Sequence, residues 1–431
     1  MSDALVRWTL PVAAAPLLVT MTTPGAAGAL AAGALGGSSG TVYYVDAEDG
    51  DDDAPGTGPG KAWRSLKPVN DAGLGPGDTV RFERGGRWTG VLTLTGDGTA
   101  DRPIAVTAYG EGPEPVVTGA DGACVRVEGS HWRISALRAS GCDWAGFEIT
   151  GDRNELVGVK ADRNVAGVVI TNAGSHNVVR DSELTANNRM SVNDGAHDND
   201  SGAFGVLLNG DDNLVTANRI SGSFARSVDY GYDGAAVEIF NGDRNRITHN
   251  VAHDNETFTE LGAEKGRTAS GNVFAHNVVT SSRKHGAFLV TRGPGHVVGP
   301  VKGTVAVHNS VHLPGRDTLG WSCHDGCSPD ILRLRYNVIS VGGVAGDEDA
   351  KGADEAGGVY RGRSLKFKLG PRSVQADPRF RGDRDLRLRP GSPALRRAAR
   401  LAPLWYGGAA LVRDVTGRPL PALPDAGAYQ H

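Results

Sequence analysis

The chain has 431 residues, which is too long for one small core, so we expect either two or three ordinary domains or one elongated array of repeats. Its 45 basic and 49 acidic residues nearly cancel, which argues against a nucleic-acid surface because that function needs a basic surplus. Hydrophobic residues make up 39% of the chain and aromatic residues 6%, so the core should consist of Val, Ile, Leu and Ala in thin layers.

The N-terminal segment has the composition of a leader. Arg7 precedes an apolar run from Trp8 to Met21, and small residues suitable for signal-peptide cleavage follow. We therefore expect residues 1–36 to be a signal peptide or a disordered leader, and the protein to be secreted. The apolar run is too short to span a membrane, and no later segment is long and apolar enough to do so.

The four cysteines are Cys124, Cys142, Cys323 and Cys327. An even number in a chain that is expected to be exported favours two disulfides. We predict the local pairs Cys124–Cys142 and Cys323–Cys327 over the two other connectivities. The motif "CHDGC" could instead belong to a metal site, but two sulfurs and one His are an incomplete set of zinc ligands.

Much of the chain can be aligned as an internal repeat, for example "DNLVTANRISGS", "RNRITHNVAHDN" and "GNVFAHNVVTSS". Each repeat has two short β-rich runs, and a third apolar run such as "GVLLN" or "AVEIF" follows or precedes them. Three short strands per repeat without a helical period predict an all-β fold, a single-stranded parallel β-helix. A β-propeller is the alternative, but its blades have roughly twice this period.

Asparagines often mark the turn after the first run of a repeat, and in a β-helix they would stack as a ladder of side-chain amides. The candidate ladder residues are Asn218, Asn250, Asn277, Asn309 and Asn337. The histidines that precede three of them, His249, His276 and His308, have the same structural interpretation, and we do not expect them to be catalytic.

The open ends of such a coil need cover because they expose strand edges. We expect the β-helix, including an N-terminal cap, to occupy residues 41–345. Residues 346–370 are polar and rich in glycine and predict a flexible loop. Residues 371–431 are rich in Pro and Arg and predict a C-terminal wrap that packs on the β-helix.

Several segments together resemble a known family: "YYVDAEDGDDDAPGTGPGKAWRSLKPVN", "PGDTVRF", the Asn-rich coils and "ADPRF…DLRLRPGSPA…GAY". They are similar to secreted bacterial right-handed parallel β-helix proteins of the pectate-lyase-like superfamily, over nearly everything after about Thr41. That superfamily includes polysaccharide lyases, glycoside hydrolases, epimerases and proteins without assigned chemistry. The resemblance therefore implies the fold and leaves the activity open.

Two glutamates recur at the same place in successive repeats, Glu238 in "AVEIF" and Glu260 in "TELG". Side chains alternate in a strand, so both should point outward and lie roughly 5 Å apart on neighbouring coils. Two like charges that close must share a proton or bind a cation. The pair therefore predicts an active centre, and the alternative is two solvated surface acids.

Two insertions, at residues 189–205 and 222–234, enter at equivalent points of successive coils and should form one wall of a cleft. Candidate substrate-binding residues on the insertions and on the far side of the cleft are Tyr230, Tyr232, His197, Arg283, His285 and Trp321. For Trp321, packing in the core or cap is an equal alternative to stacking on a sugar.

The first mechanism is a Ca²⁺-dependent polysaccharide lyase that cleaves a uronate polymer by β-elimination. Candidate metal ligands are Asp233, Glu238, Glu260 and Asp198. The resemblance implies a lysine base, for which the candidates are Lys265 and Lys284, and Arg292 is a further catalytic candidate.

The second mechanism is a retaining glycoside hydrolase that uses Glu238 and Glu260 as its carboxylate pair. The third possibility is a secreted β-helix protein that binds glycans or surfaces without catalysis. In each case we expect a polysaccharide or oligosaccharide partner, no nucleic acid, no membrane span and a monomer.

Overall fold

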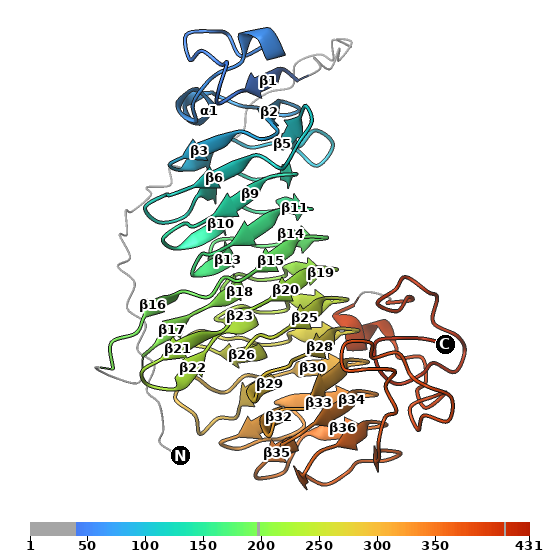
Figure 1. Cartoon of the computed structure of the whole chain (residues 1–431). Coiled ribbons are helices and arrows are strands. Elements are labelled where there is room, and N and C mark those ends of the chain that lie inside the picture. The colour runs from blue at the N-terminus through green and yellow to red at the C-terminus, as the bar shows by residue number, and fades with distance from the viewer. Residues whose placement is uncertain (1–39, 196–198, 409–410) are drawn as a thin grey trace, which may run out of the picture.

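The protein is described by a computed structural model, which covers residues 40–195, 199–408 and 411–431. Short strands stack coil upon coil into three long sheets, called sheets A, B and C here (Figure 1). Each coil contributes one strand to sheet A, then one to sheet B and one to sheet C, and strands of successive coils pair in parallel. The predicted all-β parallel β-helix with three strands per coil is thus confirmed.

Sheet A consists, in spatial order, of β1 (Val42–Val45), β2 (Thr79–Glu83), β5 (Ile104–Tyr109), β8 (Trp132–Ser135), β11 (Glu155–Val157), β14 (Val178–Arg180), β19 (Leu214–Thr216), β24 (Arg246–Thr248), β27 (Val273–Ala275), β30 (Thr304–Val307), β33 (Leu332–Arg335) and β36 (Asp354–Ala356). Sheet B consists of β3 (Arg87–Thr89), β6 (Val116–Thr118), β9 (Arg138–Ser140), β12 (Lys160–Asp162), β15 (Glu183–Thr185), β20 (Arg219–Ser221), β25 (Val251–His253), β28 (Val278–Thr280), β31 (Ser310–Leu313), β34 (Val338–Val341), β37 (Val359–Arg361) and β39 (Val374–Gln375). Sheet C consists of β4 (Leu92–Leu94), β7 (Val125–Val127), β10 (Ala145–Ile149), β13 (Ala166–Ile170), β18 (Phe204–Leu208), β23 (Ala235–Phe240), β26 (Thr257–Gly262), β29 (His285–Arg292), β32 (Asp317–His324), β35 (Val344–Glu348) and β38 (Ser364–Lys366).

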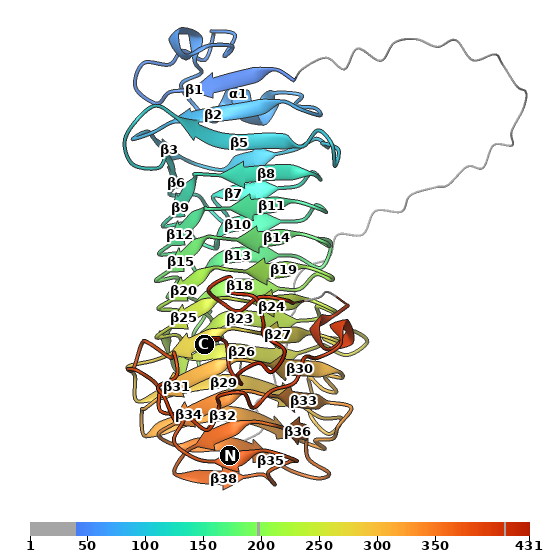
Figure 2. The ribbon, with the colours of Figure 1, turned by 90° about the vertical axis from the view of Figure 1, so that its right-hand side faces the viewer.

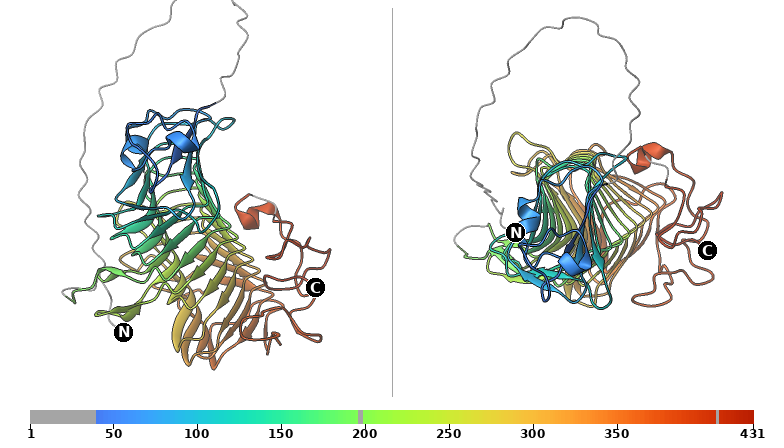
Figure 3. Two further views of the ribbon diagram at one scale, coloured as in Figure 1. Left: turned by 45° about the horizontal axis from the view of Figure 1, so that its top comes forward. Right: turned by 90° about the horizontal axis from the view of Figure 1, so that it is seen from above.

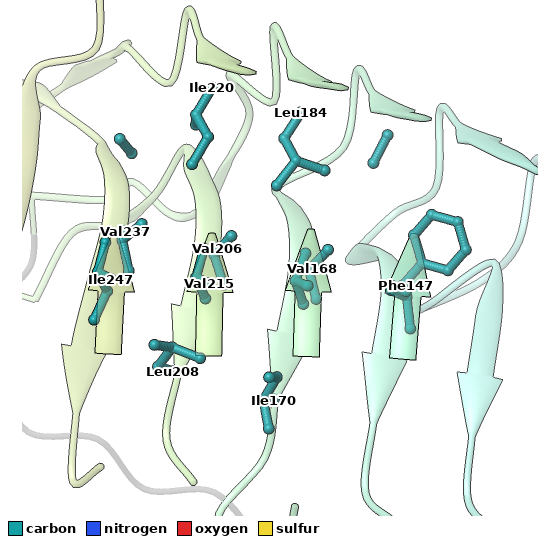
Figure 4. Close-up of a cluster of buried hydrophobic side chains, with 14 of the residues drawn as sticks. Phe147, Val168, Ile170, Leu184, Val206, Leu208, Val215, Ile220, Val237 and Ile247 are labelled. Carbon is teal, nitrogen blue, oxygen red and sulfur yellow. The ribbon is translucent and has the colours of Figure 1, made fainter. Parts of the chain in front are cut away.

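The core lies inside the coil, where register places like side chains above one another. In sheet C, Val206 pairs with Val168 on one side and with Val237 on the other, and all three are fully buried. Figure 4 shows how these residues and their neighbours form ranks of aliphatic side chains along the axis. Because each rank repeats at the strand spacing of about 4.8 Å, outward-facing residues of successive coils are aligned in the same way.

The asparagine ladder that the repeats predict is present. The side-chain amide of Asn250 donates to Oδ1 of Asn277 at 3.1 Å, and Asn277 donates to Asn309 at 3.0 Å. The rings of His249, His276 and His308 stack beside it, with centroids 5.3 and 5.0 Å apart. A second ladder along another corner, which we did not predict, links Asn154, Asn177, Asn213, Asn245 and Asn272 through backbone N–H groups.

The N-terminal end of the described coil is covered, and the C-terminal segment covers part of its outer surface. The short helices η1 (Pro59–Lys61) and α1 (Lys67–Asp71) lie at the N-terminal end (Figure 2). The C-terminal segment, with η2 (Pro403–Tyr406), lies outside the coil, as the view along the axis shows (Figure 3). Its Tyr406 packs on the outer face of sheet A and its Leu388 on that of sheet B. Sheet C is the face that carries the pocket described below.

Residues 346–370, which we expected to be a flexible loop, instead contain β36, β37 and β38, the strands of a further coil. Tyr360 points into the core, Val359 is covered by the C-terminal segment, and the buried residue of β36 is an acid, Glu355, so composition alone concealed the strands. The remaining domain boundaries stay a prediction.

Both predicted disulfides, Cys124–Cys142 and Cys323–Cys327, are formed. Over the described ranges, no helix is long and apolar enough to cross a membrane. The expected leader over residues 1–36 lies outside the described residues.

The two insertions form antiparallel hairpins, β16 (Met190–Val192) with β17 (Ser201–Gly202) and β21 (Ala225–Ser227) with β22 (Gly231–Asp233). Both leave the coil between sheet B and sheet C and project to the same side (Figure 1). Hydrogen bonds join them: the hydroxyl of Ser227 donates to Asp200 at 2.7 Å and the backbone N–H of Asp229 donates to Asp200 at 2.9 Å. The hairpins therefore form one rigid edge beside sheet C.

Candidate active site

Glu238 and Glu260 lie side by side on the outer face of sheet C. β23 and β26 pair in parallel with Glu238 directly opposite Glu260, while the flanking pair Ile239 and Leu261 points into the core. The alternation of apolar and polar residues in the two strands thus produces the geometry that the sequence predicted. At the strand spacing of about 4.8 Å, the two carboxylates are close enough to repel each other strongly.

Arg292 provides the cation that this pair requires. It lies at the end of β29, one coil beyond Glu260, and its guanidinium forms an ion pair with the Glu260 carboxylate. A second guanidinium nitrogen donates to the carbonyl of Leu261 at 2.8 Å, which fixes the orientation of the side chain. Only 18% of the Arg292 side chain is exposed, so water screens the ion pair weakly.

The two glutamates have opposite environments. Burial, followed by repulsion from Glu260 and Asp233, raises the pKa of Glu238 well above its usual value and so favours its protonated form. Glu260 has the Arg292 guanidinium beside it as an ion-pair partner. Burial, with the charge of Glu260 as the next cause, raises the pKa of Asp233 to about 7. Two neighbouring carboxyl groups in different protonation states are the arrangement that acid/base chemistry uses.

The pair lies in a pocket of about 430 Å³ between the hairpins and sheet C. Its lining is mainly acidic and aromatic: Asp200, Ser201, Phe204, Tyr230, Tyr232, Asp233, Glu238, Phe240, Glu256, Thr257, Glu260, Gly262, Arg292, His296, Val298 and Asp325. The hairpins contribute Tyr230, Tyr232 and Asp233, and β29 contributes Arg292. The structure therefore brings together six of the residues that the sequence singled out, counting the two glutamates.

Other predicted residues lie elsewhere. Lys265 and Lys284 are exposed and do not line the pocket. Arg283 lies over the ring of Phe224, 3.6 Å from its centroid, and His285 packs against Tyr232 with centroids 5.3 Å apart. These two residues support the hairpin edge from behind, and their roles in binding stay predictions.

The proposal that Trp321 stacks on a sugar is wrong. Trp321 pairs with Leu289 in the inward-facing rank of sheet C and is fully buried, with its ring against Phe367. The alternative that the sequence allowed, packing in the core, is the correct one. His197 and Asp198 lie outside the described residues, so nothing is added to the predictions for them.

The sequence did not identify Glu256, His296 and Asp325 as pocket residues. Asp325 lies inside the loop that the Cys323–Cys327 disulfide closes, and its backbone N–H donates to Asp349 at 2.8 Å. The short disulfide loop was the feature of the sequence that could have identified Asp325 as a pocket residue. Glu256 directly precedes β26, and burial raises its pKa.

The calcium site stays a prediction. Over residues 40–195, 199–408 and 411–431, no group of three or more His, Cys, Asp or Glu side chains is arranged to hold a metal ion. Arg292 forms an ion pair with Glu260 and lowers the pKa of Glu238. No step below depends on a calcium ion.

Sequence comparison gives short matches. Residues 121–299 match the family described as the right-handed β-helix region. A stretch of 101 residues, 22% of this chain, is 43% identical to the lacto-N-biosidase of Bifidobacterium longum subsp. longum, and it covers 6% of that protein. The chain thus spans a small part of the length of this relative.

Two solved structures are similar over much of their length. A pectate lyase has a TM-score of 0.61 at 14% identity, over 91% of this chain and 97% of its own. A lacto-N-biosidase from Eubacterium ramulus has a TM-score of 0.50 at 13% identity, over 78% of this chain and 68% of its own. At identities this low, the similarity is evidence for the fold alone. The chain therefore has the right-handed parallel β-helix fold.

Proposed function

We propose that the protein is a carbohydrate-active enzyme, a retaining glycoside hydrolase that acts on a neutral glycan. Glu260 is the nucleophile and Glu238 is the general acid and base. The observation that carries the proposal is the in-register pair of glutamates, of which Glu238 has a raised pKa and Glu260 is paired with Arg292. The strand spacing of about 4.8 Å is near the roughly 5–5.5 Å between carboxyl groups of retaining enzymes.

The reaction follows from these protonation states. The Glu260 carboxylate attacks the anomeric carbon and forms a glycosyl ester, while Glu238 gives its proton to the glycosidic oxygen, which leaves as an alcohol. Glu238, now a carboxylate, takes a proton from a water molecule. The water oxygen bonds to the anomeric carbon and releases Glu260, so that two displacements retain the configuration.

Arg292 and Asp233 support this cycle. Arg292 holds the Glu260 carboxylate in one orientation through its ion pair and through its hydrogen bond to Leu261. The charge of Glu260 and the nearby Asp233 disfavour a negative charge on Glu238 and so return the proton to it after each turnover.

The charge of the pocket favours hydrolysis over elimination. Its lining carries the carboxyl groups of Asp200, Asp233, Glu238, Glu256, Glu260 and Asp325 against Arg292 and His296. A uronate, which a lyase needs as substrate, would be repelled by this excess of acids. Neither lysine proposed as the base of a lyase lines the pocket. The match to a lacto-N-biosidase, which is named for hydrolysis of a glycan, supports the same choice.

Export is part of the same proposal. Two disulfides within the described residues are typical of an oxidising compartment, and a polysaccharide substrate would be met outside the cell. The secreted localisation and the monomeric state that the sequence predicts remain to be measured, by N-terminal sequencing of the exported protein and by its sedimentation.

The test is digestion of two panels, neutral oligosaccharides and uronate polymers, with product analysis by NMR. We expect a neutral glycan to be cleaved with retention of the anomeric configuration. The matched control is Glu183→Gln, which removes an exposed carboxylate from the outer face of sheet B and should leave the rate unchanged. An unsaturated uronate product would establish a lyase, and binding without any product would establish a glycan-binding protein; either result contradicts the proposal.

A further inference from the structure

A second pocket, of about 210 Å³, opens on sheet C beside the first. We call it the Trp144 pocket; residues that define it are Trp144, Glu148, Val169, Leu207, Asn209 and Phe240. Phe240 also lines the pocket of the glutamate pair, so the two pockets are neighbours, and we call them together the groove. The groove runs along the axis of the β-helix, toward its N-terminal end.

The floor of this groove is set by register. Glu148 pairs with Val169, Val169 with Leu207 and Leu207 with Glu238, one coil at a time. Three coil steps separate Glu148 from Glu238, which is about 14 Å at the strand spacing. The two residues between them are apolar and almost fully buried, Val169 at 4% and Leu207 at 6% exposure. A flat apolar floor therefore leads from the acid pair to the indole.

Trp144 is held as a fixed wall of the pocket. Its indole N–H donates to the Glu148 carboxylate at 3.1 Å, and its ring packs against an apolar cluster that includes Phe204 and Leu207. The side chain is half-buried, unlike the fully buried Trp132 and Trp321. An aromatic ring that lines a pocket and is oriented by a hydrogen bond is suited to the apolar face of a sugar ring.

Asn209 adds a polar group that the protein leaves unused. The side chain lines the pocket, and its buried Oδ1 has no hydrogen-bond partner within the described residues. Asparagines of the ladders, by contrast, have their side-chain oxygens and nitrogens bonded. An unpartnered buried amide oxygen costs free energy, and a hydroxyl donor from a ligand would remove that cost.

We propose that the Trp144 pocket binds a neutral sugar unit of the substrate, three coils from the bond that is cleaved. The inference rests on the proposed hydrolase activity for the identity of the substrate, and it requires a substrate longer than a disaccharide. Glu148 is the sole charged residue among the described residues that line the pocket, so a uronate or a sulfated sugar is disfavoured. Glu148 and Asn209 would accept hydrogen bonds from hydroxyl groups of the sugar, while Trp144 would stack on the sugar ring.

The experiment measures binding separately from turnover. Full-length Glu238→Gln protein is titrated calorimetrically with neutral oligosaccharides of increasing length, chosen from those that the wild-type protein cleaves or, failing cleavage, retains on a glycan array. We expect affinity to rise at least tenfold once the chain is long enough to reach Trp144. Trp144→Ala in the same background should abolish that rise, and Trp144→Phe should keep most of it.

The matched control is Trp405→Ala, which removes a part-buried tryptophan near Arg335, on a segment that packs against sheet A. The inference is overturned if affinity does not depend on length, or if Trp144→Ala and Trp405→Ala behave alike. Its failure is distinguishable from that of the proposed function: hydrolysis without any effect of Trp144→Ala rejects the sugar site alone. Binding that depends on Trp144 without hydrolysis rejects the hydrolase and retains the site.

Discussion

The same coils carry two columns of polar side chains, and the contrast between them separates a structural stack from a functional one. At one corner, asparagines stack as a ladder: Asn218, Asn250, Asn277, Asn309 and Asn337. An amide both donates and accepts, so each member satisfies the next and the ladder can continue for any number of coils. Such a stack stabilises the fold and leaves nothing for a ligand.

On the outer face of sheet C, the stack consists of Glu238 and Glu260. An ionised carboxylate only accepts hydrogen bonds, so two of them cannot satisfy each other. The surroundings of the pair raise the pKa of Glu238, and the guanidinium of Arg292 forms an ion pair with Glu260. Identical geometry thus has opposite consequences, and the unsatisfied stack is where chemistry is expected.

Removing one glutamate should have the largest effect on activity. Replacing Glu238 or Glu260 by Gln takes away the proton donor or the nucleophile, and we expect kcat/KM to fall by roughly 10²–10⁴-fold or more. The melting temperature of Glu238→Gln should stay close to that of the wild-type protein, because Gln has the shape of a protonated carboxyl group and leaves the ion pair between Glu260 and Arg292 in place. If the variant lost its activity because it unfolded, the glutamate pair would have a structural role like that of the asparagine ladder, and the contrast between the two columns would be wrong.

Removing one asparagine of the ladder should have the reverse effect: it should lower stability and leave activity intact. Asn277→Ala removes the hydrogen bonds from Asn277 to the carbonyl of Ile247 and to Asn309, and it leaves Asn250 without its acceptor. Each buried group left unpaired costs about 1–3 kcal/mol, so the free energy of unfolding should fall by about 3 kcal/mol. Urea denaturation measures this. Exposed Asn188→Ala is the control, and equal losses in both variants would refute a structural role for the ladder.

The histidine stack beside the ladder should make the fold sensitive to acid. Burial lowers the pKa of His308 from 6.5 to about 4. Between these values the unfolded chain binds a proton that the folded protein rejects, so stability is complete above pH 6.5 and falls as the pH drops toward 4. Over this window the loss is about 3 kcal/mol.

Denaturation at neutral pH and near pH 4 measures this loss. His308→Phe keeps an aromatic ring between His276 and Tyr336 without the titration, and it should reduce the dependence on pH. An unchanged dependence in this variant would assign the acid sensitivity to other groups.

Arg292→Gln should have the smallest effect of this series. The ion pair with Glu260 is lost, and a charged hydrogen bond of about 1.5–3 kcal/mol corresponds to a rate about 10–100-fold lower. Arg292 also lowers the pKa of Glu238, so the alkaline limb of the kcat/KM profile should move to higher pH in the variant. Arg219→Gln, at an exposed position on sheet B outside the pocket, is the control and should change neither the rate nor the profile. If the alkaline limb of the kcat/KM profile stayed at the same pH, the proposed influence of Arg292 on the pKa of Glu238 would be refuted.

Features that depend on the period of the repeat could be predicted from the sequence. The outward direction of Glu238 and Glu260 follows from the alternation within "AVEIF" and "TELG", and their pairing follows from the repeat. The same alternation in "WSC" places Trp321 inside with Cys323, so its burial was also available from the sequence.

Features that depend on the path of a loop could not be predicted. The positions of Lys265 and Lys284 outside the pocket, and of Asp325 within it, are set by turns and by a disulfide loop that no period describes. The strands in residues 346–370 were missed because only one large apolar side chain, Tyr360, joins the core there, while Glu355 is a buried acid.

The most direct test of the central claim is to trap the glycosyl ester. A slow-reacting fluorinated glycoside of the cleaved sugar is incubated with the protein, and the labelled peptide is identified by mass spectrometry. We predict one sugar per chain, attached to Glu260, and no label in Glu260→Gln. A label on another residue, or turnover of the natural glycan without any covalent species and with inversion of configuration, would contradict the account.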